Sequence, residues 1–112
     1  MKINDILNNG LVVYSTILRR KDINDTSKIL LSIIIEDCKK NKTCNLTNNE
    51  FGVLLHRVSR SVSRHVGTLK ELGYIDTKDG FYKQENDHEI YFTPCREITL
   101  TEKTEKLLKG GN

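Results

Sequence analysis

The chain has 112 residues, of which 37% are hydrophobic and 29% are charged, and its formal net charge is +3. This length allows one domain with a single core, residues 1–112, and is too short for two. The composition is that of a folded domain and excludes a disordered segment. The small positive charge permits a nucleic-acid partner without requiring one. The distribution of charge along the chain is therefore the better indicator of whether the chain binds nucleic acid.

The first part of the chain predicts a turn, a strand and a long helix. Residues 1–10 have the pattern of a short amphipathic turn, and residues 11–18 are rich in β-branched side chains, which favours a strand. The basic triplet at 19–21 has two interpretations, a solvated edge or a contact to a phosphate. Asp25, Thr26 and Ser27 offer an N-cap for a helix through SKILLSIIIEDCKK. That helix is apolar on nearly all sides, which is typical of the centre of a small core.

Two shorter helices are predicted between residues 47 and 72. Thr47 and Glu50 form a capping box, and the helix behind them should bury Phe51, Leu54 and Leu55. Ser59 is the expected cap of the next helix, which ends near Leu72 because Gly73 follows. This pair of helices predicts a helix-turn-helix.

Residues 74–100 are expected to form an antiparallel β-wing. Asp79-Gly80 is a turn signal, residues 81–83, 89–92 and 96–100 have strand patterns, and residues 84–88 form a polar tip. Pro94 interrupts the second half, and Thr101 caps a last helix that carries Leu107 and Leu108. The order of elements predicts an α+β winged helix-turn-helix, with a three-helix core, a wing and a short C-terminal helix.

The second helix of the pair has the distribution of side chains that a DNA major-groove helix requires. With Val62, Val66 and Leu69 facing a core, Arg60 and Arg64 point outward. Arginine pairs with the O6 and N7 acceptors of guanine, and small hydroxyls bond phosphates or base edges. An ordinary charged surface helix is the alternative. The candidate DNA-binding residues are Arg57, Ser59, Arg60, Ser61, Ser63, Arg64, Thr68, Lys78 and Lys83.

Two further features of this region leave alternatives open. Gly67 lies on the outward face, where it either allows close approach to a DNA backbone or is simply tolerated. Glu85 and Asp87 make the wing tip acidic, so the tip either points away from DNA or serves another partner.

The segment NLTNNEFGVLLHRVSRSVSRHVGTLKELGYI resembles the winged helix-turn-helix of plasmid replication initiators and phage replisome organisers. The closing REITLTEKTEKLL resembles the last wing strand and following helix of MarR-like repressors, with Thr104 at a position often held by glycine. The resemblance implies DNA contacts by Arg60, Ser61, Ser63 and Arg64, and no catalytic residue. His56 departs from the pattern, because the turn usually carries glycine there.

No metal, cofactor or membrane partner is expected. The cysteines form no C-x-x-C pair and the histidines do not complete a zinc-ligand set, so we expect reduced thiols in the cytoplasm. No signal-peptide pattern is visible, and the longest apolar run, Ile29 to Ile35, is far too short to cross a bilayer. The cysteines and histidines of the chain are Cys38, Cys44, Cys95, His56, His65 and His88.

The function expected from these patterns is sequence-specific binding of double-stranded DNA at an operator, origin, partition or transfer site of a mobile element. A homodimer is expected through apolar residues near the two ends, although Leu107 and Leu108 can equally cap the chain's own core. The alternative is a protein-interaction module, or an accessory subunit of a replication or transfer complex, acting through the acidic wing tip. No enzymatic activity is expected, since the sequence has no P-loop, nucleophile elbow or paired-carboxylate site.

Overall fold

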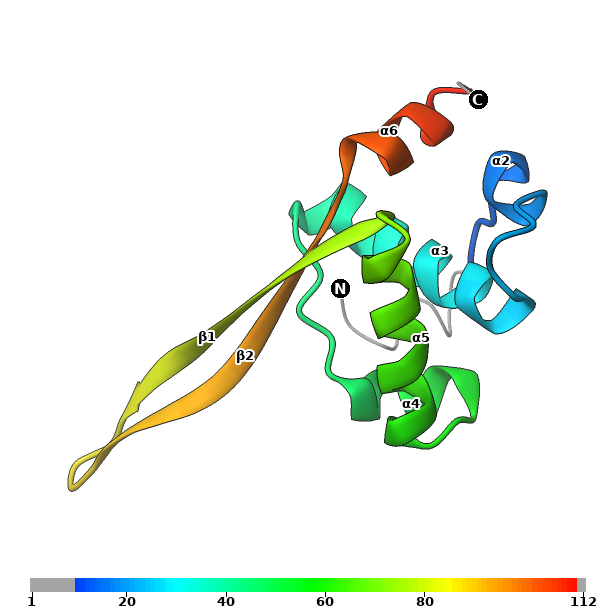
Figure 1. Cartoon of the computed structure of the whole chain (residues 1–112). Helices are drawn as coiled ribbons and strands as arrows, with labels where there is room; N and C mark the ends of the chain where they lie inside the picture. The colour runs from blue at the N-terminus through cyan, green and yellow to red at the C-terminus, as the bar shows by residue number, and fades with distance from the viewer. Residues whose placement is uncertain (1–9, 111–112) are drawn as a thin grey trace.

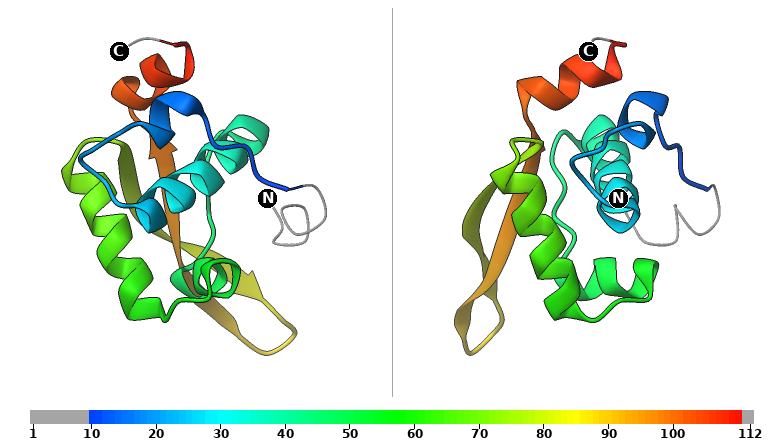
Figure 2. Two further views of the ribbon diagram at one scale, coloured as in Figure 1. Left: turned by 90° about the vertical axis from the view of Figure 1, so that its right-hand side faces the viewer. Right: turned by 45° about the vertical axis from the view of Figure 1, so that its right-hand side comes forward.

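The computed structural model describes residues 10–110, so the turn predicted for residues 1–10 lies almost wholly outside the described residues. Within this range the chain is α+β, with five helices and one two-stranded antiparallel sheet (Figure 1). The elements are α2 (Ser15–Leu18), α3 (Asp25–Asn41), α4 (Asn48–Leu55), α5 (Ser59–Glu71), β1 (Ile75–Glu85), β2 (Ile90–Leu100) and α6 (Glu102–Leu108). The helices gather into one body and the β1–β2 hairpin extends away from it, as Figures 1 and 2 show, so the molecule measures 53 × 27 × 25 Å.

The long helix α3 provides the centre of the core, as its all-round apolar pattern predicts. Leu30, Leu31 and the run from Ile33 to Ile35 are buried, and α2, α4, α5 and β2 all contact this helix. Its N-cap is Asn24, whose side chain accepts a hydrogen bond from the Ser27 backbone N–H at 2.9 Å. The predicted cap at residues 25–27 is therefore wrong by one residue, because Asn24 is itself a favoured cap and leaves Asp25 in the first turn.

The strand predicted for residues 11–18 is wrong, because residues 15–18 form the helical turn α2. Ile17 is completely buried in the core, and the Thr16 hydroxyl donates to the Leu107 carbonyl oxygen at 2.9 Å. These contacts with α6 outweigh the β propensity of the segment, which is a weak preference where no strand lies alongside. Leu107 is buried and Leu108 is half-buried against the same core, so these leucines cap the chain's own core.

The capping box of α4 is confirmed. The Glu50 backbone N–H donates to Thr47 Oγ1 at 3.1 Å, and the Thr47 backbone N–H donates to Glu50 Oε1 at 3.0 Å. Phe51 is completely buried, whereas Leu54 and Leu55 pack against the core while remaining partly exposed.

The hairpin is longer and more regular than the sequence predicts. Asp79 and Gly80 lie inside β1, opposite Arg96 and Cys95, so they form no turn, and the loop lies between Glu85 and Ile90. Pro94 lies inside β2 without interrupting it. In the same strand, the backbone N–H and carbonyl of Ile98 point away from β1 and form hydrogen bonds with Cys44. Pro94 lies four residues earlier, so its missing N–H also faces the outer edge, where no ladder bond is lost.

Several contacts hold the base of the hairpin against the helices. The two backbone bonds between Cys44 and Ile98 measure 2.9 and 2.8 Å, and they attach β2 to the segment that precedes α4. The Arg96 guanidinium donates to Asn48 Oδ1 and to the Leu46 carbonyl oxygen, both at 2.8 Å. On the other side, Thr104 Oγ1 donates to the Tyr74 carbonyl oxygen at 2.7 Å. The base of the hairpin is therefore fixed to α4 and α6.

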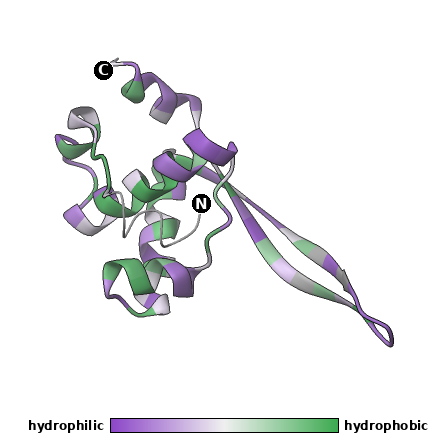
Figure 3. Cartoon of the chain, turned by 180° about the vertical axis from the view of Figure 1, so that it is seen from behind, coloured by the Kyte–Doolittle hydropathy of each residue, from purple (hydrophilic) through white to green (hydrophobic). Residues whose placement is uncertain are grey.

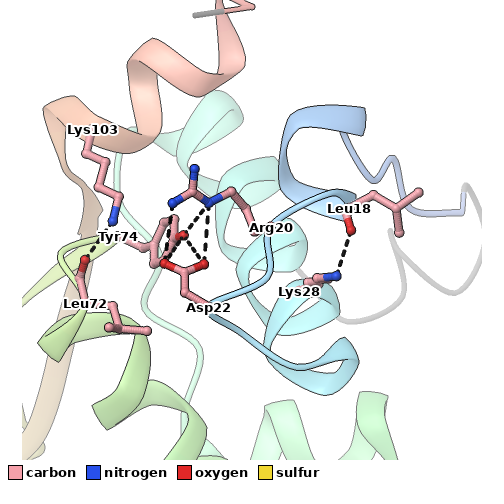
Figure 4. Close-up of polar contacts among 7 residues, drawn as sticks. All are labelled: Leu18, Arg20, Asp22, Lys28, Leu72, Tyr74 and Lys103. Carbon is pink, nitrogen blue, oxygen red and sulfur yellow. Dashed lines mark hydrogen bonds and ion pairs between the residues drawn. The ribbon is translucent and has the colours of Figure 1, made fainter. Parts of the chain in front are cut away.

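Tyr74 also joins the α2–α3 loop to the base of the hairpin (Figure 4). Its hydroxyl donates to the Asp22 carboxylate at 2.7 Å and accepts from Arg20 Nε at 2.8 Å. Lys103 of α6 lies over the Tyr74 ring, 4.2 Å from its centroid, and donates to the Leu72 carbonyl oxygen. Partial burial alone would raise the pKa of Asp22, but the hydrogen bonds from Tyr74 and Arg20 outweigh it and hold that pKa below its usual value.

Tyr74→Phe is expected to lower the free energy of unfolding by about 1 kcal/mol at pH 7, because it removes both hydroxyl hydrogen bonds. The Asp22 contribution is present above its unfolded pKa of about 3.9 and is lost as the pH falls through the lower folded value. The difference between wild type and variant should therefore shrink on acidification. Urea unfolding at pH 7 and pH 3 measures it, and a difference that stays constant between the two pH values would contradict this account.

Candidate nucleic-acid interface

Helix α5 divides cleanly into a buried face and an exposed face. Val62, Val66 and Leu69 are buried, as their spacing predicts. Arg60 and Arg64 are exposed on the other side, one helical turn apart. Among the described residues, neither arginine forms an ion pair with an acidic side chain. Both guanidinium groups are thus available to a partner outside the chain.

The remaining predicted residues of this region lie on or beside the same face. Ser63 is exposed, whereas Ser61 and Thr68 are half-buried at its margins. The Thr68 hydroxyl donates to the Arg64 backbone carbonyl at 3.1 Å, so one of its hydrogen-bonding groups is already used within the helix. Gly67 is exposed, and no atom outside the helix lies within 4 Å of the position its Cβ would take. The space beside Gly67 is therefore open.

The turn between α4 and α5 consists of residues 56–58 and depends on two backbone features. His56 has φ +53° and ψ +47°, the left-handed conformation for which glycine is most common and which histidine adopts more readily than most residues. Arg57 then donates its backbone N–H to the Gly52 carbonyl oxygen at 3.0 Å. A Cβ at Gly52 would lie 2.5 Å from the Arg57 carbonyl oxygen, so the turn requires glycine inside α4.

The predicted N-cap of α5 is wrong by one residue. Val58 occupies the cap position with extended backbone, and no side-chain hydrogen bond caps the helix. Ser59 is the first helical residue, so its hydroxyl is exposed beside Arg57 and Arg60 at this end of the helix. Serine is a favoured cap, so the sequence predicts it at Ser59, but the three-residue turn places the cap one residue earlier, at Val58.

His65 joins α5 to the start of α3. Its Nδ1 lies 2.9 Å from the Ser27 hydroxyl, which is buried. Burial, and then the nearby charges of Arg64 and Arg57, lower the pKa of His65 below its usual value. His65 is therefore neutral at pH 7 and serves to position α5.

The basic triplet at 19–21 is divided between two roles. Arg20 is held by Asp22 and Tyr74, whereas Arg19 and Lys21 are exposed. Lys21 and Arg64 both line an open polar cavity of about 460 Å³ between the α2–α3 loop and α5. Asp22 lines this cavity too, but its charge is already paired with Arg20. The exposed positive charge thus continues from α5 onto the α2–α3 loop. The sequence alone did not distinguish between the two interpretations of the basic triplet.

The two hairpin lysines are less available for a partner than the arginines of α5. Lys78 and Lys83 are exposed on β1, but Lys78 lies opposite Glu97. Lys83 forms an ion pair with Glu85 at 2.8 Å. Their positive charge is therefore offset by neighbouring glutamates, and Lys83 also lies next to the acidic tip.

Comparisons with known proteins give no relative from which a role for these residues could be transferred. No model of a known protein family matches the chain, and neither the curated proteins nor the solved structures include a match. Within residues 10–110, no group of three or more histidine, cysteine, aspartate or glutamate side chains is arranged to hold a metal ion. No helix in this range is long and apolar enough to cross a membrane.

Proposed function

We propose that this chain is a winged-helix protein that binds double-stranded DNA sequence-specifically, with α5 as the helix in the major groove. The observation that carries the proposal is that Arg60 and Arg64 are exposed, without an acidic partner among the described residues, on a helix whose opposite face is buried in the core. In this assignment α3, α4 and α5 are the three-helix core and the β1–β2 hairpin is the wing.

The electrostatics of the surrounding surface support the same orientation. Arg57 at the start of α5 and Lys21 beside Arg64 are both exposed, and they flank the face that would enter the groove. Contacts from such flanking basic groups to phosphates fix the position of a protein on the duplex. The acidic hairpin tip would be repelled by phosphates, so we place it away from the DNA.

The biological setting is proposed from the resemblance described above. It favours a cytoplasmic protein of a plasmid or phage that acts at an operator, origin, partition or transfer site. A homodimer on a two-fold-related site accompanies this proposal. Because Leu107 is buried, the homodimer requires a contact surface other than this leucine.

Binding of a labelled mixed-sequence duplex, followed by fluorescence anisotropy at 50 and 200 mM salt, tests the proposal. If three or four phosphates are contacted, the affinity should fall about 40- to 150-fold between these concentrations, because counterions are released from the DNA. An absence of binding at 50 mM salt would contradict the proposed function.

The hairpin supports a second candidate function, a protein-interaction module. Phe81, Ile90 and Phe92 are 69%, 61% and 63% exposed. In the antiparallel register they share one face with Ile75 and Ile98, which are buried at the base. Figure 3 shows hydrophobic positions along the strands behind a hydrophilic tip. The ion pair of Lys83 and Glu85 lies on the same face. The exposed apolar side chains therefore form a mixed surface, and a protein partner that covered it would stabilise the hairpin.

Replacing Phe81 and Phe92 together with serine tests whether a second copy covers this face. The wild-type chain should show a concentration-dependent increase in mass by sedimentation velocity, and the variant's dissociation constant should be at least tenfold higher, since two large apolar contacts are lost. DNA binding to a single site should remain unchanged. A wild-type chain that stays monomeric at all concentrations would exclude self-association through the hairpin.

A further inference from the structure

Val58 is the feature of α5 that neither folding nor the arginine contacts explain. It is 72% exposed, the highest value among the exposed large hydrophobic side chains of the described residues. It is the last residue of the α4–α5 turn, between the exposed residues Arg57 and Ser59. The most water-exposed large apolar side chain thus lies at the N-terminal end of the proposed groove helix.

The helix would be capped better by another residue at this position. Serine, threonine, asparagine and aspartate are favoured at an N-cap because their side chains accept a backbone N–H of the first turn, and valine is among the poorest choices. Here the cap has no side-chain hydrogen bond. The other long helices show the favourable pattern, with Asn24 capping α3 and Thr47 capping α4. Valine at position 58 therefore contributes less to the stability of α5 than a capping side chain would.

We infer that Val58 contacts the methyl group of a thymine at one position of the DNA site, an inference that rests on the proposed function. The first residues of a helix in the major groove lie against the base edges. The thymine methyl is the apolar group that base pairs present there, and small apolar side chains recognise it. Valine suits this contact, because β-branching restricts its χ1 angle outside helices too, so the side chain at this extended cap position loses little freedom on binding.

The contact complements the arginines. Arg60 and Arg64 supply donors that select guanine, whereas Val58 adds selection for thymine at the neighbouring end of the same helix. A site recognised by α5 should therefore combine guanines with a thymine whose methyl group adds to the affinity.

The test first selects a preferred duplex from a random library and then replaces its thymines, one at a time, with deoxyuridine. This change removes only the methyl group and leaves the protein untouched. At one position of each half-site, wild-type affinity should fall about fourfold, the value of one buried methyl group. In Val58→Ser that difference should disappear, while the midpoint of thermal unfolding should rise because serine caps the helix.

Val12→Ser provides the matched control, since it changes an exposed valine in the segment before α2. It should keep the full deoxyuridine effect. DNA binding without any deoxyuridine effect, or an effect of equal size in wild type and Val58→Ser, would overturn the role of Val58 and leave the proposed function intact. A wild-type chain that binds no duplex would remove the proposed function and this inference together.

Discussion

Replacing both Arg60 and Arg64 with alanine is expected to lower affinity for the selected DNA site by at least a hundredfold. Each well-placed arginine–guanine contact contributes about 1–3 kcal/mol of discrimination, so two contacts near the middle of this range exceed a hundredfold change in affinity. Both side chains are exposed and neither has an acidic partner among the described residues, so their loss should change the free energy of unfolding by no more than about 0.5 kcal/mol. Affinity is measured by anisotropy, and stability by urea unfolding.

The matched control removes the same charge from another part of the surface. Lys40→Ala with Lys109→Ala also removes two exposed positive charges, at the C-terminal ends of α3 and α6. This variant should bind nearly as tightly as wild type, because its lysines lie outside the proposed groove contact. Equal losses in both double variants would indicate that net charge alone drives binding, and an unchanged affinity in the arginine variant would exclude α5 as the groove helix.

Gly52→Ala is expected to destabilise the fold by about 1–3 kcal/mol, the usual cost of forcing an extra methyl group into a packed site. This result opposes the general rule, since alanine in a helix interior is normally more stable than glycine by about 0.5–1 kcal/mol. The added Cβ would lie 2.5 Å from the Arg57 carbonyl oxygen, which belongs to the backbone of the turn. Relief requires the turn to move, and α5 with it.

Gly67→Ala provides the opposite case in the neighbouring helix. Its Cβ would meet no atom within 4 Å, so this variant should be more stable by about 0.5–1 kcal/mol. Urea unfolding of the two variants under the same conditions compares them directly. If both glycines gave the same sign of change, the close approach at the turn would not be the decisive interaction. If Gly67 serves to allow close approach to a DNA backbone, its alanine variant should also bind more weakly despite its higher stability.

The parts of the fold that were predicted correctly are those with strong local signals. The capping box at Thr47 and the alternation of buried and exposed residues in α5 are specified within one or two helical turns. The middle of α3, which is apolar on nearly all sides, likewise leaves few alternatives to a central helix. The exposure of Arg60 and Arg64 follows directly from the burial of Val62 and Val66.

The errors occurred where distant contacts decide the structure. The segment at 15–18 is helical because Ile17 and Thr16 meet the core and α6, almost a hundred residues later in the chain. Asp79-Gly80 continues a strand because Arg96 and Cys95 lie opposite, although the pair on its own has the sequence of a hairpin turn. Val58 stands at the start of α5 because the turn displaces the cap by one residue, which the serine at position 59 does not indicate.

The hairpin is long and attached to the helices at its base, so a small rotation at the base moves the tip by a large distance. Eleven residues per strand extend for roughly 35 Å at about 3.3 Å per residue, so a rotation of about ten degrees at the base displaces the tip by roughly 6 Å. Only two residues, Gly73 and Tyr74, separate α5 and its C-cap from β1, and Tyr74 is held by hydrogen bonds on both sides. A partner bound at the tip would therefore act on the C-terminal end of α5 through the base of the hairpin.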